Sequence, residues 1–150
     1  MPLLKAGWRD FWAIWLVQGV TFGRDAWDPI ELGWQLLTSP VRLKAVDDGQ
    51  VQGYVFGERR AHDGAGFITT LGVHPQHRNR GLGRQLLQAA EAQLATQRVC
   101  LTVRPSNTIA LRLYETAGYR QIRRIPRYYS GGEDGLEMEK ALVLAAPLQG

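Results

Sequence analysis

The segment Leu71–Glu91, which reads LGVHPQHRNRGLGRQLLQAAE, tells more about this chain than any other stretch. Its apolar first residues predict the end of a strand, which turns at His74-Pro75. A basic loop with two glycines follows and leads directly into a helix. Backbone N–H groups in the first turn of a helix have no intrahelical partners, and the helix dipole favours an anion there. The segment therefore predicts a phosphate-binding loop.

The residue types of this loop suit an anion. Gly81 and Gly83 let the backbone approach it closely, while Arg78, Arg80 and Arg84 surround it with positive charge. The loop lacks the Gly-Lys-Ser/Thr ending of a Walker loop and the third glycine of a dinucleotide-binding fingerprint. The alternative is an ordinary strand–loop–helix connection whose arginines face solvent.

The remaining pattern predicts a short first strand, two helices and three antiparallel strands before the loop helix, then a strand, a helix and two strands. The DDGQ sequence at 47–50 predicts a hairpin turn. Leu82, Leu86, Ala90 and Leu94 place one apolar face along the loop helix. The expected helices are 8–20, 29–37, 81–97 and 106–117, the last with Gly118 at its C-cap, and the expected strands are 3–5, 41–46, 51–57, 67–73, 99–103, 119–125 and 136–144.

Length and charge narrow the class of protein. A chain of 150 residues predicts one domain over residues 1–150, large enough for a core without disulfides or metal. Lysine plus arginine number 18 against 14 acidic residues, but the basic residues are scattered, so we expect no nucleic-acid partner. The single cysteine, Cys100, offers neither a disulfide framework nor paired metal ligands, and favours a cytoplasmic location without a metal site.

The apolar run from Phe11 to Phe22 is too short to span a bilayer, which takes about 20 residues. Trp8, Trp12 and Trp15 stand at i, i+4 and i+7, the spacing of one helix face. We therefore expect a helix with this tryptophan face, and Trp34 of the next helix, in the core. No membrane partner or targeting segment is expected.

A second set of motifs follows in the order VRPSN (103–107), ALRLY (110–114), GY (118–119), RYY (127–129) and GED (132–134), ending at Met138. Together with the R-x-x-G-x-G of the loop, this order resembles the GNAT N-acetyltransferases. It is most similar to the branch that acetylates protein N-termini, typified by bacterial ribosomal-protein alanine acetyltransferases. The resemblance is strong over about residues 50–142 and weak over the first forty.

This resemblance implies an α+β, sandwich-like GNAT fold. Its central sheet is mixed and mostly antiparallel, with six or seven strands and helices on both faces. Strands four and five splay apart, and acetyl-CoA lies in the gap. The cofactor-binding residues implied are Leu71, Gly72 and Val73 on the strand, Arg78, Asn79, Arg80, Gly81, Leu82, Gly83 and Arg84 at the pyrophosphate, and Asn107 on the cofactor arm. For Asn107 a plain helix cap is the alternative.

The same resemblance implies that the Tyr114 hydroxyl is the general acid for the departing thiolate, and that Trp27, Tyr128 and Tyr129 contact the acceptor. For the three tyrosines the alternative is a packing role, with no contact to the substrate or the thiolate. Two adjacent tyrosines in an extended segment point to opposite faces, so only one is expected to reach the substrate.

The general base is where the sequence departs from the branch pattern. Thr102 stands where that branch often has a glutamate, which leaves Glu58, His62, His74 and Glu137 as candidates. An α-amine has a pKa near 8 and a lysine ε-amine near 10.4, so a site without an evident base suits an α-amine better.

The sequence thus predicts an acetyl-CoA-dependent N-acetyltransferase, acting as a monomer or homodimer on a protein or peptide N-terminus. A small amine such as a polyamine, amino acid or aminoglycoside is the second candidate acceptor. A non-catalytic acyl-CoA-binding sensor is the third possibility, which the absent glutamate favours and Tyr114 opposes.

Overall fold

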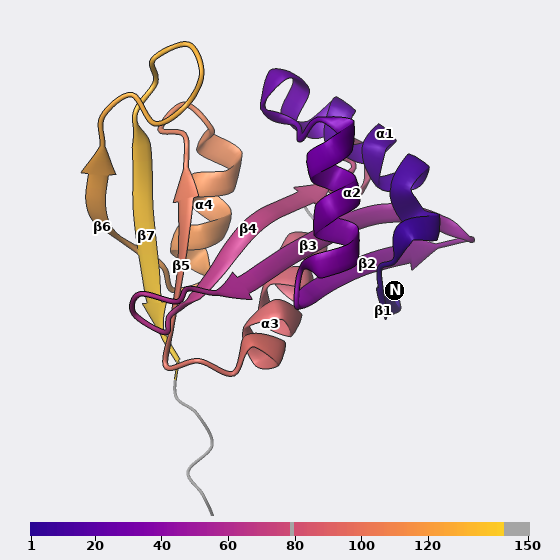
Figure 1. Ribbon diagram of the computed structural model, residues 1–150, viewed down its shortest axis with the longest axis horizontal. Coiled ribbons are helices and arrows are strands. Elements are labelled where there is room, and N and C mark those ends of the chain that lie inside the picture. The colour runs from indigo at the N-terminus through magenta and orange to yellow at the C-terminus, as the bar shows by residue number, and fades with distance from the viewer. Residues whose placement is uncertain (79, 143–150) are drawn as a thin grey trace, which may run out of the picture.

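The computed structural model describes residues 1–78 and 80–142, which form a sheet covered by helices on both faces (Figure 1). The strands are β1 (Leu3–Lys5), β2 (Val41–Asp47), β3 (Gln50–Arg59), β4 (Gly66–Val73), β5 (Arg98–Val103), β6 (Arg120–Ile125) and β7 (Gly135–Ala141). The helices are α1 (Phe11–Phe22), α2 (Pro29–Thr38), α3 (Leu82–Leu94) and α4 (Thr108–Thr116), with 3-10 turns at Trp8–Asp10, Gly23–Asp25 and Pro75–His77. The α+β prediction is confirmed.

The sheet of the described residues has seven strands in the order β1-β2-β3-β4-β5-β7-β6. Neighbouring strands are antiparallel except for the parallel pair β4–β5. That pair is short, since only Gly66 with Val99 and Phe67 with Cys100 face each other. Beyond these residues β4 stays with β3 and β5 stays with β7, so the two strands diverge. The predicted splay between strands four and five is confirmed.

Two hydrophobic clusters lie on the two faces of this sheet. Helices α3 and α4 cover one face, and the predicted α3 residues Leu82, Leu86, Ala90 and Leu94 are all buried there. Helices α1 and α2 cover the other face, where Ile14 and Leu32 pack around Tyr54 and Phe56 of β3. Burial from both sides makes the sheet the rigid frame of the molecule.

The predicted β2–β3 hairpin is confirmed by its turn. Asp48 has φ 50° and Gly49 has φ 73°, so both central residues are left-handed. This turn type matches the right-handed twist of the strands that it joins.

The prediction that the tryptophan face of α1 lies in the core is wrong. Trp8 and Trp12 are 66% and 72% exposed, Trp15 is half-buried, and Ile14, Val17 and Gln18 are the buried residues of α1. Trp34 of α2 is also exposed. The helix has apolar side chains on every side, so periodicity could not select the buried face. The α-helix also begins at Phe11, after a 3-10 turn that contains Trp8.

Several element ends differ from those predicted. Helix α3 stops at Leu94 because Ala95 adopts a left-handed conformation, with φ 52°. The C-cap of α4 is Ala117, and Gly118 follows it with φ 102°. Strand β7 ends at Ala141, and residues 143 and 144 of the predicted strand lie outside the described residues.

Candidate functional site

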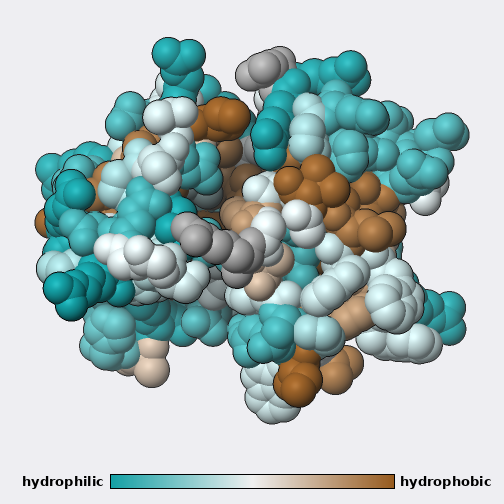
Figure 2. Space-filling model, turned by 90° about the horizontal axis from the view of Figure 1, so that it is seen from above, coloured by the Kyte–Doolittle hydropathy of each residue, from teal (hydrophilic) through white to brown (hydrophobic). Residues whose placement is uncertain are grey.

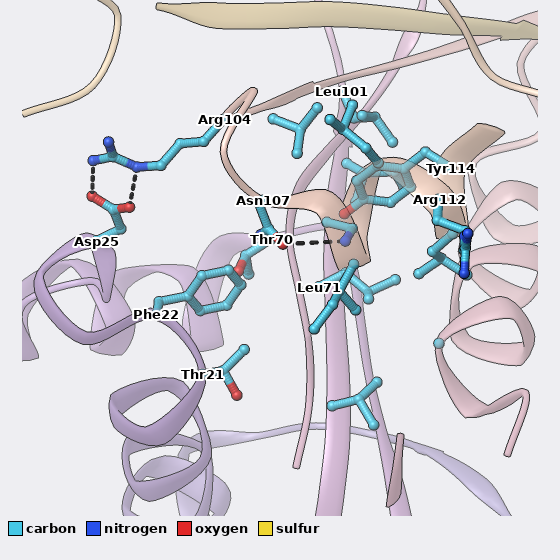
Figure 3. Close-up of a pocket in the computed structure, with 18 of the residues that line it drawn as sticks. Thr21, Phe22, Asp25, Thr70, Leu71, Leu101, Arg104, Asn107, Arg112 and Tyr114 are labelled. Carbon is cyan, nitrogen blue, oxygen red and sulfur yellow. Dashed lines mark hydrogen bonds and ion pairs between the residues drawn. The ribbon is translucent and has the colours of Figure 1, made fainter. Parts of the chain in front are cut away.

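The divergence of β4 and β5 opens a cleft of about 1000 Å³. Both strands line it, together with α1, α4 and the N-terminus of α3 (Figure 3). Figure 2 shows the molecule hollowed between the half that carries α1 and α2 and the half that carries the β6–β7 loop. The cleft therefore reaches from the side of the sheet that α3 and α4 cover to the side that α1 and α2 cover.

The backbone of β4 forms one edge of the cleft. His74 N–H donates to the Gln52 carbonyl at 2.8 Å, and the register pairs Tyr54 with Gly72 and Val55 with Leu71. Hydrogen-bonded and non-hydrogen-bonded pairs alternate in an antiparallel ladder. Gly72 therefore bonds to β3, whereas Leu71 and Val73 turn their N–H and C=O groups toward the gap. Because buried backbone groups need partners, these two residues fit an extended, amide-bearing ligand.

The backbone groups of Gly72 bond to β3, so they are not free for a ligand. Its lack of a side chain instead leaves room for a neighbouring ring. A Cβ on Gly72 would lie 2.8 Å from the ring of Tyr54, which packs on the side of the sheet that α1 and α2 cover. The expectation of a backbone contact from all three β4 residues is thus reduced to Leu71 and Val73.

A β-bulge in β4 sets which side chains face the cleft. The register shifts between Phe56 and Gly57, which leaves Thr69 without an opposite residue in β3. Ile68 and Leu71 therefore both point into the α3 core, although they are three residues apart. Thr69 and Thr70 line the cleft as a result.

The basic loop meets the cleft at the N-terminus of α3. Gly81 is the N-cap, with φ 77°, a conformation that glycine adopts without strain. A Cβ on Gly83 would lie 3.0 Å from Leu113 Cδ2, so this glycine permits α3 and α4 to pack closely. Leu82 buries its side chain in the core, which leaves only its backbone for a ligand.

The arginines of the loop divide into two groups. Arg78 and Arg84 line the cleft, and Arg84 also donates from Nη2 to the Thr116 carbonyl at 3.2 Å. Arg80 instead borders a separate small hollow beside Met1 and Gln85. Asn79 lies outside the described residues. Arg112 of α4, which the sequence did not single out, also lines the cleft.

Asn107 is both a helix cap and a residue that lines the cleft. Its Oδ1 accepts a hydrogen bond from Ala110 N–H at 3.1 Å, so the residue is the N-cap of α4 (Figure 3). It also lines the cleft. The cap uses the side-chain oxygen, and the amide nitrogen is the group that would serve a ligand.

Tyr114 lies on the cleft side of α4. Figure 3 shows its hydroxyl directed into the cleft, on the side where Asn107 and Leu71 lie. The side chain is buried, and burial raises the pKa of Tyr114 to about 12. The hydroxyl therefore stays protonated even in alkaline solution, and it points into the cleft as a candidate hydrogen-bond donor.

The loop between α1 and α2 walls the opposite end of the cleft. Gln18 Nε2 donates to the Trp27 carbonyl at 2.9 Å, and Trp27 N–H donates to Gln18 Oε1 at 3.2 Å. The Trp27 ring packs on Phe56 with 5.4 Å between centroids. Trp27 therefore lines the cleft from a fixed position. These two hydrogen bonds satisfy the side-chain amide of Gln18, which is buried in the otherwise apolar α1.

Arg104 joins three loops at this end, a role that the sequence did not reveal. Its Nη2 lies 2.6 Å from Asp25 Oδ1, and its Nη1 lies 2.9 Å from Glu133 Oε1. Its guanidinium also stacks 4.5 Å from the centroid of the Tyr129 ring. The hydrogen bonds to Asp25, foremost, and to Glu133 raise the pKa of Arg104 above its usual range. The VRPSN motif contains this arginine, but its partners lie 79 and 29 residues away in the chain.

Of the two adjacent tyrosines, only Tyr129 lines the cleft. Tyr128 is 49% exposed and stands perpendicular to Tyr129, with 4.8 Å between ring centroids. Contact of either tyrosine with a substrate stays a prediction.

None of the four candidate bases lines the cleft. Glu58 and His62 are exposed, and His74 follows the end of β4. Glu137 is buried on β7, where Arg123 Nη2 donates to its Oε2 at 2.9 Å. Thr102 does line the cleft, so the strand position that could have carried a glutamate faces the site without an acid. The lining carboxylates in the described part of the chain are Asp25 and Glu115.

The residues that the structure describes contain no group of three or more side chains placed to hold a metal ion. None of the helices within residues 1–78 and 80–142 has the length and apolar character needed to cross a membrane.

These features, a splayed β4–β5 pair above a glycine-bearing helix N-terminus, agree with what the sequence comparison finds. Residues 8–119 match the family described as acetyltransferase (GNAT) family. The chain belongs to this family, and the GNAT resemblance seen in the sequence is confirmed.

Individual relatives differ in how much of them is matched. The catalytic subunit NAA20 of the N-terminal acetyltransferase B complex of Arabidopsis thaliana is 40% identical over 99 residues, which cover 62% of this chain and 57% of the relative. Across five curated relatives, the matched region spans 48% to 64% of their length.

Solved structures match nearly the whole chain at lower identity. The ribosomal-protein-S18-alanine N-acetyltransferase of Escherichia coli has a TM-score of 0.84 at 19% identity, covering 99% of this chain and 98% of that one. The NatC complex bound to Gag peptide and CoA also has a TM-score of 0.84, at 20% identity, covering 95% and 98%. At these identities the likeness establishes the fold.

Proposed function

We propose that this protein, as one domain, is an acetyl-CoA-dependent N-acetyltransferase whose acceptor is the α-amine of a protein or peptide N-terminus. One observation carries the proposal: a single cleft contains the free backbone edge of β4, the N-terminus of α3 and the Tyr114 hydroxyl. It also reaches the wall formed by Trp27 and Tyr129. A donor and an acceptor can therefore meet beside one buried phenol.

The residues present fit acetyl-CoA. The pantetheine arm carries amides, which would pair with the free N–H and C=O groups of Leu71 and Val73. The pyrophosphate is an anion, which suits the first turn of α3 with Arg78 and Arg84 beside it. When bound, the cofactor supplies a thioester, whose carbonyl carbon a neutral amine can attack.

The chain's own groups then manage the protons. As the C–N bond forms and the C–S bond breaks, the sulfur needs one proton and the amine must lose one. Tyr114 supplies the first, because its protonated hydroxyl points into the cleft beside the splayed strands. Of the two lining carboxylates of the described residues, Asp25 is held by Arg104, and Glu115 is exposed near the C-terminal end of α4. The amine proton is therefore expected to leave through water.

The absence of a strong base at the acceptor end bears on the acceptor. Converting an amine of pKa near 8 to its neutral form at pH 7 takes about 3 kcal/mol less than for one near 10.4. An α-amine can thus react in this cleft where a lysine side chain would mostly remain charged. The names of the similar proteins, which are N-terminal acetyltransferases, support the same choice.

The experiment is acetyl-CoA turnover, measured as free thiol, with a panel of free-N-terminus peptides, polyamines, amino acids and aminoglycosides. We expect turnover with peptides, and its loss on blocking their α-amines. Turnover with small amines alone would reassign the acceptor and keep the enzyme class. Tight acetyl-CoA binding without turnover on any acceptor would favour a sensor.

A further inference from the structure

The outer side of α1 carries a row of exposed apolar side chains. Trp12, Leu16 and Val20 follow one another at four-residue intervals, and Trp8 extends the row into the preceding 3-10 turn. Each of the four is between 61% and 72% exposed. The helix has no charged residue from Phe11 to Phe22. A helix that is apolar all round is normally covered on all sides.

Helix α2 presents a second row of the same kind. Ile30, Trp34 and Leu37 stand at i, i+4 and i+7 and are between 62% and 85% exposed. The two helices pack against each other on the same face of the sheet (Figure 1). Figure 2 shows hydrophobic side chains gathered on the half of the molecule that carries α1 and α2. We call the two rows together the α1–α2 face.

The size of this face suits a protein interface. Aromatic side chains of this size bury roughly 200 Å² each, so the three tryptophans and four aliphatic side chains expose on the order of 800 Å². The largest apolar patch of a typical monomer is about 300–600 Å². A stable protein–protein interface takes about 800 Å² from each partner. The face alone therefore meets the requirement of a dimer.

Charge decides between a membrane surface and a protein partner. Helices that lie on membranes are rich in lysine and arginine around their apolar side. The segment 8–38 has four acidic residues and two arginines, in a chain whose net charge is +4. Two of the four acids, Asp10 and Asp25, are paired with Lys44 and Arg104, and the other two balance the arginines. The segment therefore lacks the basic border of a membrane-bound helix.

We propose that the α1–α2 face pairs with the same face of a second copy of this chain, forming a two-fold homodimer. In such an isologous contact the same patch is used by both copies, so an excess of one charge on it would repel. This face has none among its seven side chains, which makes it complementary to itself. The resulting core is four helices, two from each copy.

The dimer leaves the cleft open. None of the seven face residues lines the cleft, whereas Gln18 and Phe22, on the other side and at the end of α1, do. The proposal therefore stands independently of the acetyltransferase function, and activity is not needed to test it.

The test is the molar mass of the full chain by sedimentation or light scattering, from nanomolar to high micromolar concentration. We expect the mass to rise from 16.8 kDa to twice that value and then stay constant. Trp12→Glu and Trp34→Glu each place a charge inside the apolar contact, so these variants should remain monomeric at every concentration. Both side chains are exposed in the single chain, so far-UV circular dichroism should show unchanged folding.

The matched control is Ile122→Glu, which adds the same charge at a partly exposed apolar residue of β6, away from the face. It should dimerise like the natural chain. A natural chain that stays monomeric at every concentration would overturn the proposal. So would a Trp12→Glu variant that still dimerises, or a mass that grows beyond two copies.

Discussion

Helices α1 and α3 have 12 and 13 residues and pack on opposite faces of one sheet, yet their sequences inform very differently. In α3, polar residues alternate with leucine and alanine, so only one face can be buried and the sequence identifies it. In α1 every face is apolar, and packing selects Ile14 and Val17 over the larger tryptophans. Hydrophobic periodicity therefore predicts which face of a helix is buried only where the opposite face is polar.

The same contrast divides the cleft. The cofactor end is built from local sequence, since β4, the basic loop and α3 follow one another in the chain. The acceptor end is built from distant segments, since Arg104 joins Asp25 and Glu133. We therefore expect substitutions at the two ends to affect different constants, while Tyr114 between them affects the reaction itself.

The largest effect is expected for Tyr114→Phe. Removing a general acid lowers kcat by about 10²–10⁴-fold, while the ring and its packing stay. The dissociation constant of acetyl-CoA should not change. Tyr119→Phe is the matched control, because its hydroxyl donates to Glu91 at 2.6 Å outside the cleft. That variant should lose stability and retain kcat; equal losses of kcat would remove Tyr114 from the chemistry.

The contrast within α1 can be measured by stability. Ile14→Ala empties a fully buried site and should lower the free energy of unfolding by about 2–5 kcal/mol. Trp12→Ala removes a larger but exposed side chain and should change it by less than about 0.5 kcal/mol in dilute protein. Denaturant unfolding gives both values. A larger loss for Trp12 would mean that this face is covered within the single chain.

How much the sequence could predict follows from these two helices. The α3 face and the hairpin turn rest on short-range patterns and the splay on the family resemblance, and these three agree with the structure. The role of Tyr114 rests on the same resemblance and stays a prediction. The exposed face of α1 and the ion pairs of Arg104 depend on which distant segments meet. Contacts between distant segments leave no local pattern in the sequence, so neither feature could be predicted from it.

The basic loop offers a matched pair for the cofactor end. Arg78 lines the cleft, whereas Arg80 borders a separate hollow. Losing a charge-assisted hydrogen bond costs about 1.5–3 kcal/mol, so Arg78→Ala should weaken acetyl-CoA binding by tenfold or more. Arg80→Ala should change it less than about twofold. Calorimetric titration distinguishes them, and equal effects would count against the position of the cleft.

The acceptor end is tested by Arg104→Gln. This change releases Asp25 and Glu133, and the loops that carry Trp27 and Tyr129 lose their common contact. A misplaced acceptor wall should raise KM for the peptide about tenfold, with KM for acetyl-CoA unchanged. Steady-state kinetics with each substrate varied in turn separates the two. A change confined to acetyl-CoA would place Arg104 at the cofactor instead.

The smallest effect concerns pH. The rate should rise as the peptide α-amine, of pKa near 8, loses its proton, and then stay level to at least pH 10.5. It should not fall there, because Tyr114 remains protonated until about pH 12. The same raised pKa favours folding fully below pH 10 and loses that contribution as pH rises toward 12. A fall in kcat near pH 10 would point to a solvent-exposed acid.

The most direct test of the proposed function is where the acetyl group goes. A peptide with a free N-terminal α-amine and an internal lysine is incubated with the protein and acetyl-CoA, and fragment masses locate the modification. We expect one acetyl group on the α-amine, formed by the natural chain and lost with Tyr114→Phe. Acetylation of the lysine alone would contradict the account.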